Sequence, residues 1–148
     1  MEDKEIQYFT DGMKLVSNEF YFDAIHKFNM LIEEFPISDL AIDSLYNIGL
    51  CYFKMKQFEM AIETFQQVLA MYPEATISNL SNENIFGKTA AKCLYSILLS
   101  HLLMGHSKEA LEISSQLTQF SEDTYIIVDD ERITYAELAD IVLKNFNP

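Results

Sequence analysis

The sequence predicts an all-α fold built from pairs of helices. Apolar residues recur at three- and four-residue steps along most of the 148-residue chain, and one set of landmark residues occurs twice at a fixed distance. Only four glycines and three prolines interrupt these patterns, and 49% apolar residues suffice for a buried core. We therefore expect a globular domain of amphipathic helices.

Residues 38–73 contain the clearest helix pair. Apolar side chains follow helical spacing over residues 45–55 and again over residues 58–72, with a short polar break between them. Gly49 lies inside the first of these helices, where glycine costs about 1 kcal/mol relative to alanine. Its missing side chain predicts a close approach of the second helix, which we place at Ala61.

Residues 8–36 repeat the same landmarks. Four residues of this segment return 37 positions later in the same order, namely Gly12, Ala24, Phe28 and Pro36, which become Gly49, Ala61, Phe65 and Pro73. With Leu45, Ile48 and Tyr52, this spacing resembles the tetratricopeptide repeat, in which a large residue, Leu-Gly, Tyr, Ala, Phe and Pro stand at these offsets. Leu45 replaces the usual tryptophan, and Asp11 replaces the expected leucine in the earlier copy.

The resemblance implies a right-handed α-α superhelix of about three helix hairpins with a C-terminal capping helix, all within a single domain over residues 1–148. We place the repeats at about residues 5–38, 42–75 and 91–122. Residues 76–88 are then an insert, and residues 123–148 are a connector and the capping helix.

The third repeat is the most divergent of the three. It aligns through Ala110, which places Gly105 in the turn between its helices. Leu98 stands where the glycine is expected, and Ser114 stands where the phenylalanine is expected. A large residue on one helix opposite a small one on the other conserves volume, so we expect these two side chains to be neighbours.

The helices are expected at about residues 3–17 and 21–34, followed by a third helix capped by Ser38 or Asp39. After Pro73, a Ser- and Asn-rich loop leads to a helix that resumes near Glu83 and ends near Met104.

The C-terminal segment combines a β-like run with a helix signal. Residues 125–128 read Tyr-Ile-Ile-Val, which we interpret as an extended connector too isolated to form a sheet. Thr134 and Glu137 form a capping-box pattern that opens a last helix over residues 135–145.

Composition limits the classes of partner. The net charge of −13 repels nucleic acids and anionic membranes. The sequence predicts no membrane span and no signal peptide, and hence a cytoplasmic protein. Cys51 and Cys93 lie in apolar helical patterns and are expected to be reduced, packed thiols.

The sequence predicts no enzyme, cofactor or metal site. His26, His101 and His106 lack a metal-binding neighbour four residues away and a nearby cysteine pair. The acidic run at residues 129–131 lacks the alternation and glycine of a calcium loop. No phosphate-binding glycine loop or nucleophile elbow is present in the sequence.

In the family, the first helix of each hairpin lines a concave groove that receives protein segments. Carrying these positions over predicts a mostly apolar partner-binding groove, formed by Phe9, Met13, Val16, Tyr46, Leu50, Phe53, Tyr95, Leu99 and Leu102.

Some chaperone-binding members of the family hold a C-terminal carboxylate with a clamp of polar and basic side chains. Here Asn47 and Lys92 occupy two clamp positions, but Phe9, Met13 and Ser96 occupy the others. A carboxylate would gain too little from two groups to offset its desolvation, so the sequence argues against a clamp.

The function predicted first is a non-enzymatic protein-interaction module that binds an apolar or amphipathic segment in this groove. In a second hypothesis the chain's own tail, or another copy in a homodimer, fills the groove. A third is a chaperone of the type III secretion class for an apolar client, which rests on analogy of fold.

Overall fold

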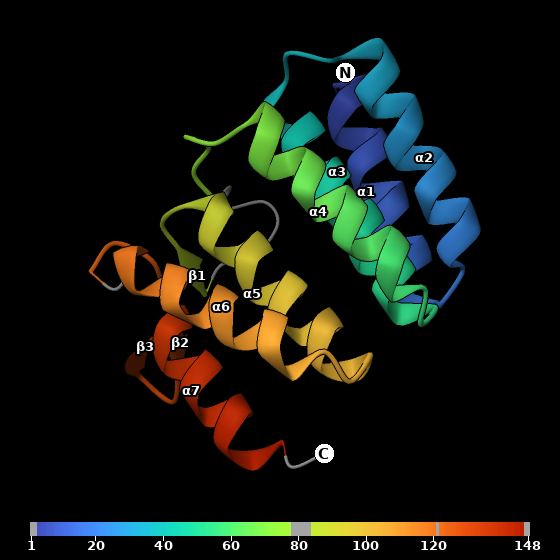
Figure 1. Ribbon diagram of the computed structural model, residues 1–148. Coiled ribbons are helices and arrows are strands. Elements are labelled where there is room, and N and C mark those ends of the chain that lie inside the picture. Colours follow the sequence, from blue (N-terminus) through green and yellow to red (C-terminus); the bar gives the residue numbers. More distant parts are fainter. Residues whose placement is uncertain (1–2, 78–83, 121, 147–148) are drawn as a thin grey trace. The chain divides into compact units, whose positions relative to one another are not determined.

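The computed structural model describes residues 3–77, 84–120 and 122–146, which form seven α-helices, a short 3-10 helix and one three-stranded sheet (Figure 1). The chain divides into two compact units, residues 1–68 and 69–148. The predicted all-α class is confirmed by helices that pack in neighbouring pairs, whereas the small sheet was not predicted. The predicted repeat boundaries and their membership in a single domain stay predictions.

The first unit consists of consecutive helices that pack against each other. They are α1 (Lys4–Ser17), α2 (Tyr21–Glu34), α3 (Asp39–Lys54) and α4 (Phe58–Met71), the last of which passes into the second unit from Leu69 onward. Ser38 is the N-cap of α3, because its hydroxyl accepts a hydrogen bond from the Leu40 N–H at 3.1 Å. The predicted start of this helix is therefore confirmed.

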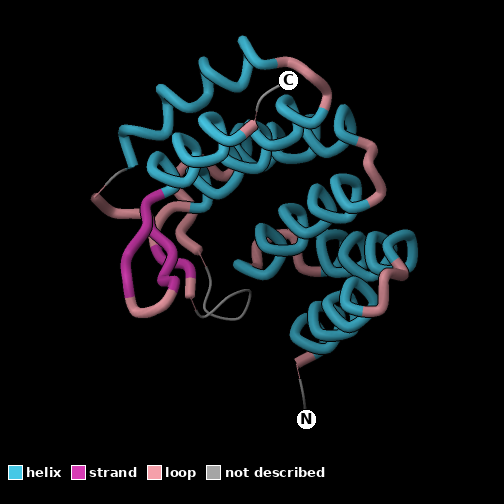
Figure 2. The backbone as a smooth tube through the Cα atoms, turned by 90° about the horizontal axis from the view of Figure 1, so that it is seen from below, coloured by secondary structure: helices cyan, strands magenta, loops and turns pink. Residues whose placement is uncertain are grey.

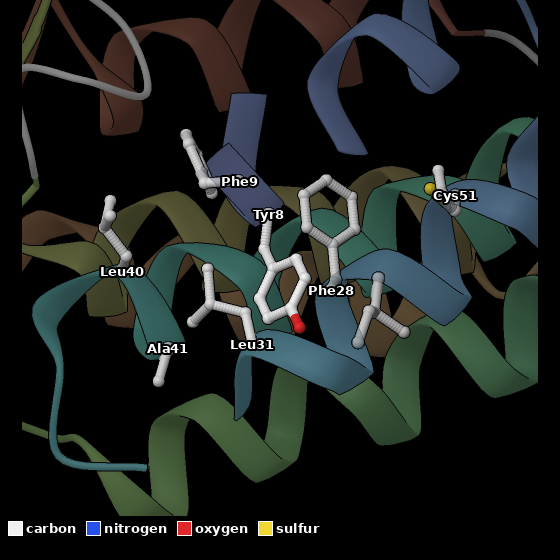
Figure 3. Close-up of a cluster of buried hydrophobic side chains, with 9 residues drawn as sticks. Tyr8, Phe9, Phe28, Leu31, Leu40, Ala41 and Cys51 are labelled. Atoms are coloured by element: carbon white, nitrogen blue, oxygen red, sulfur yellow. The ribbon is translucent and has the colours of Figure 1, made fainter. Parts of the chain in front are cut away.

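A cluster of apolar side chains fills the space between α1, α2 and α3. Figure 3 shows Tyr8 and Phe9 of α1 beside Phe28 and Leu31 of α2, with further contributions from α3. All nine residues of this cluster are buried. The apolar stripes seen in the sequence therefore face one another, and their burial holds the hairpin together.

The two landmark glycines make room for phenylalanine rings. A Cβ atom added at Gly12 would lie 2.5 Å from Cε1 of Phe28, and one added at Gly49 would lie 2.5 Å from Cε1 of Phe65. The nearest atoms at Gly49 thus belong to Phe65, one turn beyond the expected contact at Ala61. Glycine and phenylalanine recur together in the sequence because each pair forms one packing contact.

Three helix hairpins turn in the same way. After the first helix, one residue adopts a positive φ, and the next residue donates its backbone N–H to the carbonyl five residues before it. This is the Schellman motif, which satisfies carbonyls at the end of a helix. The donor and acceptor pairs are Phe20 and Leu15, Gln57 and Tyr52, and His106 and His101. Gly105 lies in the third turn, as predicted, with φ of 81°.

The second unit packs three helices around its own apolar cluster. They are α5 (Thr89–Leu103), α6 (Ser107–Leu117) and α7 (Tyr135–Asn145), and a 3-10 turn (Thr118–Phe120) follows α6. Leu98 is fully buried in this cluster, whereas Ser114 is partly exposed and donates to the Leu111 carbonyl of its own helix. The expected contact between Leu98 and Ser114 stays a prediction.

The prediction that residues 125–128 cannot join a sheet is wrong. They form β2 (Tyr125–Val128), which pairs antiparallel with β1 (Ile85–Phe86) and with β3 (Glu131–Thr134) (Figure 2). Asp129 and Asp130 form the two-residue turn between β2 and β3, with φ of 51° and 64°. Positive φ at both positions is typical of a type I′ hairpin turn, which aspartate tolerates.

The predicted start of α5 near Glu83 is also wrong. Residues 78–83 lie outside the described residues, but β1 follows at 85–86, and α5 begins only at Thr89. Gly87 has φ of 114°, and the Lys88 N–H donates to the Thr124 hydroxyl at 2.9 Å. The local pattern of residues 83–88 favours a helix, but residues 85 and 86 instead pair with the distant β2. Strand formation depends on such neighbours in the folded chain more than on local sequence.

The last helix has the predicted bounds. The Thr134 hydroxyl accepts a hydrogen bond from the Glu137 N–H at 3.1 Å, which caps α7. Tyr135 and Ala139 are buried in the second cluster, and α7 packs against both α5 and α6. The helix therefore covers apolar side chains that the hairpin of α5 and α6 would leave exposed.

Candidate partner-binding surface

The nine residues of the predicted groove lie on the first helices of the hairpins. Three come from α1, three from α3 and three from α5. Those of α1 and α3 belong to the first unit, and those of α5 belong to the second. Within each unit, their burial separates them into core residues and residues with accessible surface.

Three of the nine residues are almost fully buried. Phe9 is 3% exposed, Tyr46 is 7% exposed and Leu102 is 4% exposed. The ring centroid of Phe9 lies 5.9 Å from that of Phe28, and the centroid of Tyr46 lies 5.3 Å from that of Phe65. These two rings face the second helix of their own hairpins. Aromatic rings at such distances stabilise the core and leave little surface for a partner.

The other six residues are half-buried and keep accessible apolar surface. Met13 and Val16 lie at the edge of the first cluster, and Tyr95 and Leu99 lie at the edge of the second. On α3, Leu50 and Phe53 keep partial exposure. We call these six side chains the candidate partner residues; Met13, Val16, Leu50 and Phe53 lie in the first unit, and Tyr95 and Leu99 lie in the second.

Tyr95 is contacted by the C-terminal helix. Its ring centroid lies 5.4 Å from that of Tyr135, the first residue of α7. Burial raises the pKa of both phenols, so both stay neutral at physiological pH. The tail of the chain therefore covers part of the surface that the third repeat was predicted to offer.

Polar side chains are buried on α3 of the first unit and, separately, on α5 of the second. Asn47 donates to the Asp43 carbonyl at 2.8 Å, and Ser96 donates to the Lys92 carbonyl at 3.0 Å. The charged side chains of Asp43 and Lys92 are buried as well, and neither is without a partner. Sequence reasoning missed this burial, although polar residues four apart among apolar ones were the available signal.

This burial bears on the carboxylate clamp. Asn47 and Lys92, which occupy two clamp positions, are 4% and 5% exposed. A partner's carboxylate would need donors that point into accessible space. The geometry thus adds a second argument against a clamp to the one drawn from the sequence.

The described residues offer little reactive chemistry. No group of three or more His, Cys, Asp or Glu side chains that could hold a metal ion is found among them. Cys51 and Cys93 are buried free thiols, and burial raises the pKa of each to about 12. Both sulfur atoms therefore remain protonated and unreactive at neutral pH.

Exposed apolar side chains on the second helices and turns are a feature that sequence reasoning missed. Phe20 and Phe22 stand at the start of α2, and Phe22 is 71% exposed. Leu111 on α6 is 57% exposed. Scattered exposed apolar residues are common on protein surfaces. Phe22 and Leu111 are therefore suitable control positions for variants of the candidate partner residues.

Within the described residues, no helix combines the length and apolar character needed to cross a membrane.

Comparison with known proteins identifies the repeat. The tetratricopeptide repeat family matches residues 42–74, which correspond to the second predicted repeat. The chain therefore contains a tetratricopeptide repeat at these residues. Within it, the contact of Gly49 with Phe65 and the Schellman turn that joins Gln57 to Tyr52 hold the two helices of the repeat together. Among curated proteins, no sequence matches this chain.

The fold is similar to that of the Hsp90 co-chaperone Cns1 from Saccharomyces cerevisiae. The TM-score is 0.66 at 14% sequence identity, over 97% of this chain and 40% of the co-chaperone structure. This chain therefore spans less than half the length of that protein. At such low identity the likeness shows a shared fold.

Proposed function

We propose that this protein binds an apolar or amphipathic segment of a partner protein, without catalysis, through the candidate partner residues on the first helices of its hairpins. The observation that carries the proposal is the recurrence of half-buried apolar side chains on the first helix of each hairpin. Burying a fully exposed side chain of this kind is worth roughly 1.5–3 kcal/mol, and a half-buried one gains the part of this that corresponds to its remaining accessible surface. Repeated helix faces of this kind suit recognition of a partner helix or strand.

The charge of the chain narrows the chemistry of the partner. With 23 acidic and 10 basic residues, the protein favours partners that carry basic groups around their apolar segment. A cytoplasmic location, in which such partners and reduced cysteines coexist, is part of this proposal.

The structurally similar protein is named as a co-chaperone of Hsp90. We do not propose Hsp90 as a partner of the present chain. The clamp positions carry Phe9, Met13 and Ser96, and the two polar clamp residues are buried. The proposed partner therefore contributes apolar side chains and no essential terminal carboxylate.

The test replaces one candidate residue in each unit by an acidic one. Leu50→Glu and Tyr95→Glu, separately and together, should abolish affinity capture of partners, while far-UV circular dichroism shows that the variants remain folded. Phe22→Glu and Leu111→Glu on the second helices are matched controls and should capture normally. Unchanged capture by the folded double variant would refute the proposal.

The contact between Tyr95 and Tyr135 favours a second candidate function, in which the tail regulates or replaces partner binding. Under this alternative, a chain truncated after Glu122 binds partners more tightly than the whole chain, and added peptide 123–148 reverses the gain. If the groove instead receives a second copy, sedimentation should show a dimer that the Leu50→Glu change dissociates. Equal partner affinity of the whole and truncated chains would exclude regulation by the tail.

A further inference from the structure

His101 and His106 bring two imidazole nitrogens together at the turn between α5 and α6. Their Nδ1 atoms lie 3.4 Å apart, and their ring centroids lie 5.6 Å apart with the planes tilted by 39°. Two nitrogens bound to one tetrahedral zinc ion at about 2.0–2.1 Å would lie about 3.3–3.4 Å apart. The two Nδ1 atoms therefore stand at the separation of two ligands of one zinc ion, and without a metal ion the same distance allows a long hydrogen bond between them.

The backbone holds this pair in place. The His106 N–H donates to the His101 carbonyl at 2.8 Å, the Gly105 N–H donates to the Leu102 carbonyl at 3.0 Å, and Gly105 supplies the positive φ. In a Schellman motif, the side chains of the two residues joined by the longer bond normally make an apolar contact. The equivalent residues at the other two turns, Leu15 with Phe20 and Tyr52 with Gln57, include no such pair of ligands.

A negative charge lies near the pair, since Glu109 interacts electrostatically with His101. Imidazole binds metals in its neutral form, and a nearby negative charge favours a bound cation. The buried thiols of Cys51 and Cys93 are protonated and do not compete.

We propose that His101 and His106 form a two-histidine site for a borderline divalent metal ion such as Zn²⁺ or Ni²⁺, bridging the end of α5 and the start of α6. Imidazole is a preferred ligand of these ions. No third protein ligand completes a cluster among the described residues, so water fills the remaining positions and the ion stays exchangeable. The inference is independent of the proposed partner binding.

The experiment titrates untagged protein with ZnCl₂ or NiCl₂ in millimolar Mg²⁺, which occupies weak carboxylate sites. Calorimetry should give one ion per chain, and His101→Asn or His106→Asn should each weaken that binding by at least about tenfold. His26→Asn, on the exposed face of α2, is the matched control and should bind like the wild type.

A second measurement needs no variant. In the wild-type protein, Zn²⁺ should shift the imidazole proton resonances of His101 and His106 together and leave those of His26 in place. Acidification should reverse the shift, because protons compete for the same nitrogens. Zinc binding that survives in both histidine variants, or unchanged resonances of the pair at millimolar Zn²⁺, would overturn the proposal.

Discussion

The rings of Phe28 and Phe65 explain why glycine occupies positions 12 and 49. In the first two hairpins a glycine in the middle of the first helix contacts a phenylalanine ring of the second helix, at a distance that a Cβ atom could not occupy. Helix propensity alone would favour alanine at both positions, so the packing contact determines the residue.

Gly49→Ala should therefore lower the free energy of unfolding by about 1–3 kcal/mol, because overpacking exceeds the gain of roughly 1 kcal/mol in helix propensity. Urea denaturation followed by circular dichroism measures the change. Phe65→Leu in the Gly49→Ala background should recover part of the loss. A stabilised Gly49→Ala variant would contradict the contact with Phe65.

The buried thiols give a prediction on reactivity and pH. Cys51 and Cys93 should resist alkylation at pH 8 in the native protein and react fully in denaturant, whereas Leu103→Cys, at the exposed end of α5, should react at once. Because the folded-state pKa of each thiol is raised from 9.0 to about 12, the neutral thiols favour the folded state below pH 9. The free energy of unfolding should therefore fall as pH rises from 9 toward 12. In a Cys51→Ala/Cys93→Ala variant, which lacks both thiols, it should fall less over the same pH range.

At the scale of elements, the sheet of the second unit depends on the turn between β2 and β3. The register pairs Val128 with Glu131, so Asp129 and Asp130 are the two turn residues, and both have positive φ. Beyond the turn, the Tyr125 ring stacks on the Phe86 ring with centroids 5.5 Å apart. The Arg132 guanidinium lies over the Tyr125 ring, 4.5 Å from its centroid. Cross-strand contacts of this kind stabilise short sheets.

Asp130→Gly should raise the free energy of unfolding by about 0.5–1 kcal/mol, because Asp-Gly is a favoured type I′ sequence and glycine carries no steric penalty at positive φ. Asp130→Val should lower it instead. Amide exchange at Ile126 and Ile133, which pair across the hairpin, should slow in the glycine variant. Faster exchange there would contradict the assigned turn.

At the scale of the whole molecule, the charge of −13 dominates encounters with other macromolecules. The association rate with a basic amphipathic peptide should fall as salt rises from about 0.05 to 0.5 M, since salt screens steering between exposed charges. Stopped-flow fluorescence of a labelled peptide measures this rate. The dissociation rate should change little with salt if apolar burial holds the complex, and a large salt effect on it would contradict an apolar interface.

The sequence by itself determined those features that depend on neighbours along the chain. Helical periodicity, caps and turn residues predicted the bounds of α2 and α7, the cap at Ser38 and the glycine turn at Gly105. The internal repeat identified the family, because its landmarks form contacts within one hairpin.

Only the tertiary structure decided features that join distant segments. The pairing of β1 with β2 brings together residues that lie 41 and 39 positions apart, Ile85 with Ile126 and Phe86 with Tyr125, and no local pattern at Ile85 predicts it. Phe9, Tyr46 and Leu102 were predicted to face a groove, but packing buries them, since apolar side chains on two faces of a helix look alike in sequence. The contact of His101 with His106 likewise depends on how the chain reverses after α5. The pattern of residues along the chain determines where helices form, whereas three-dimensional packing determines which side chains become neighbours.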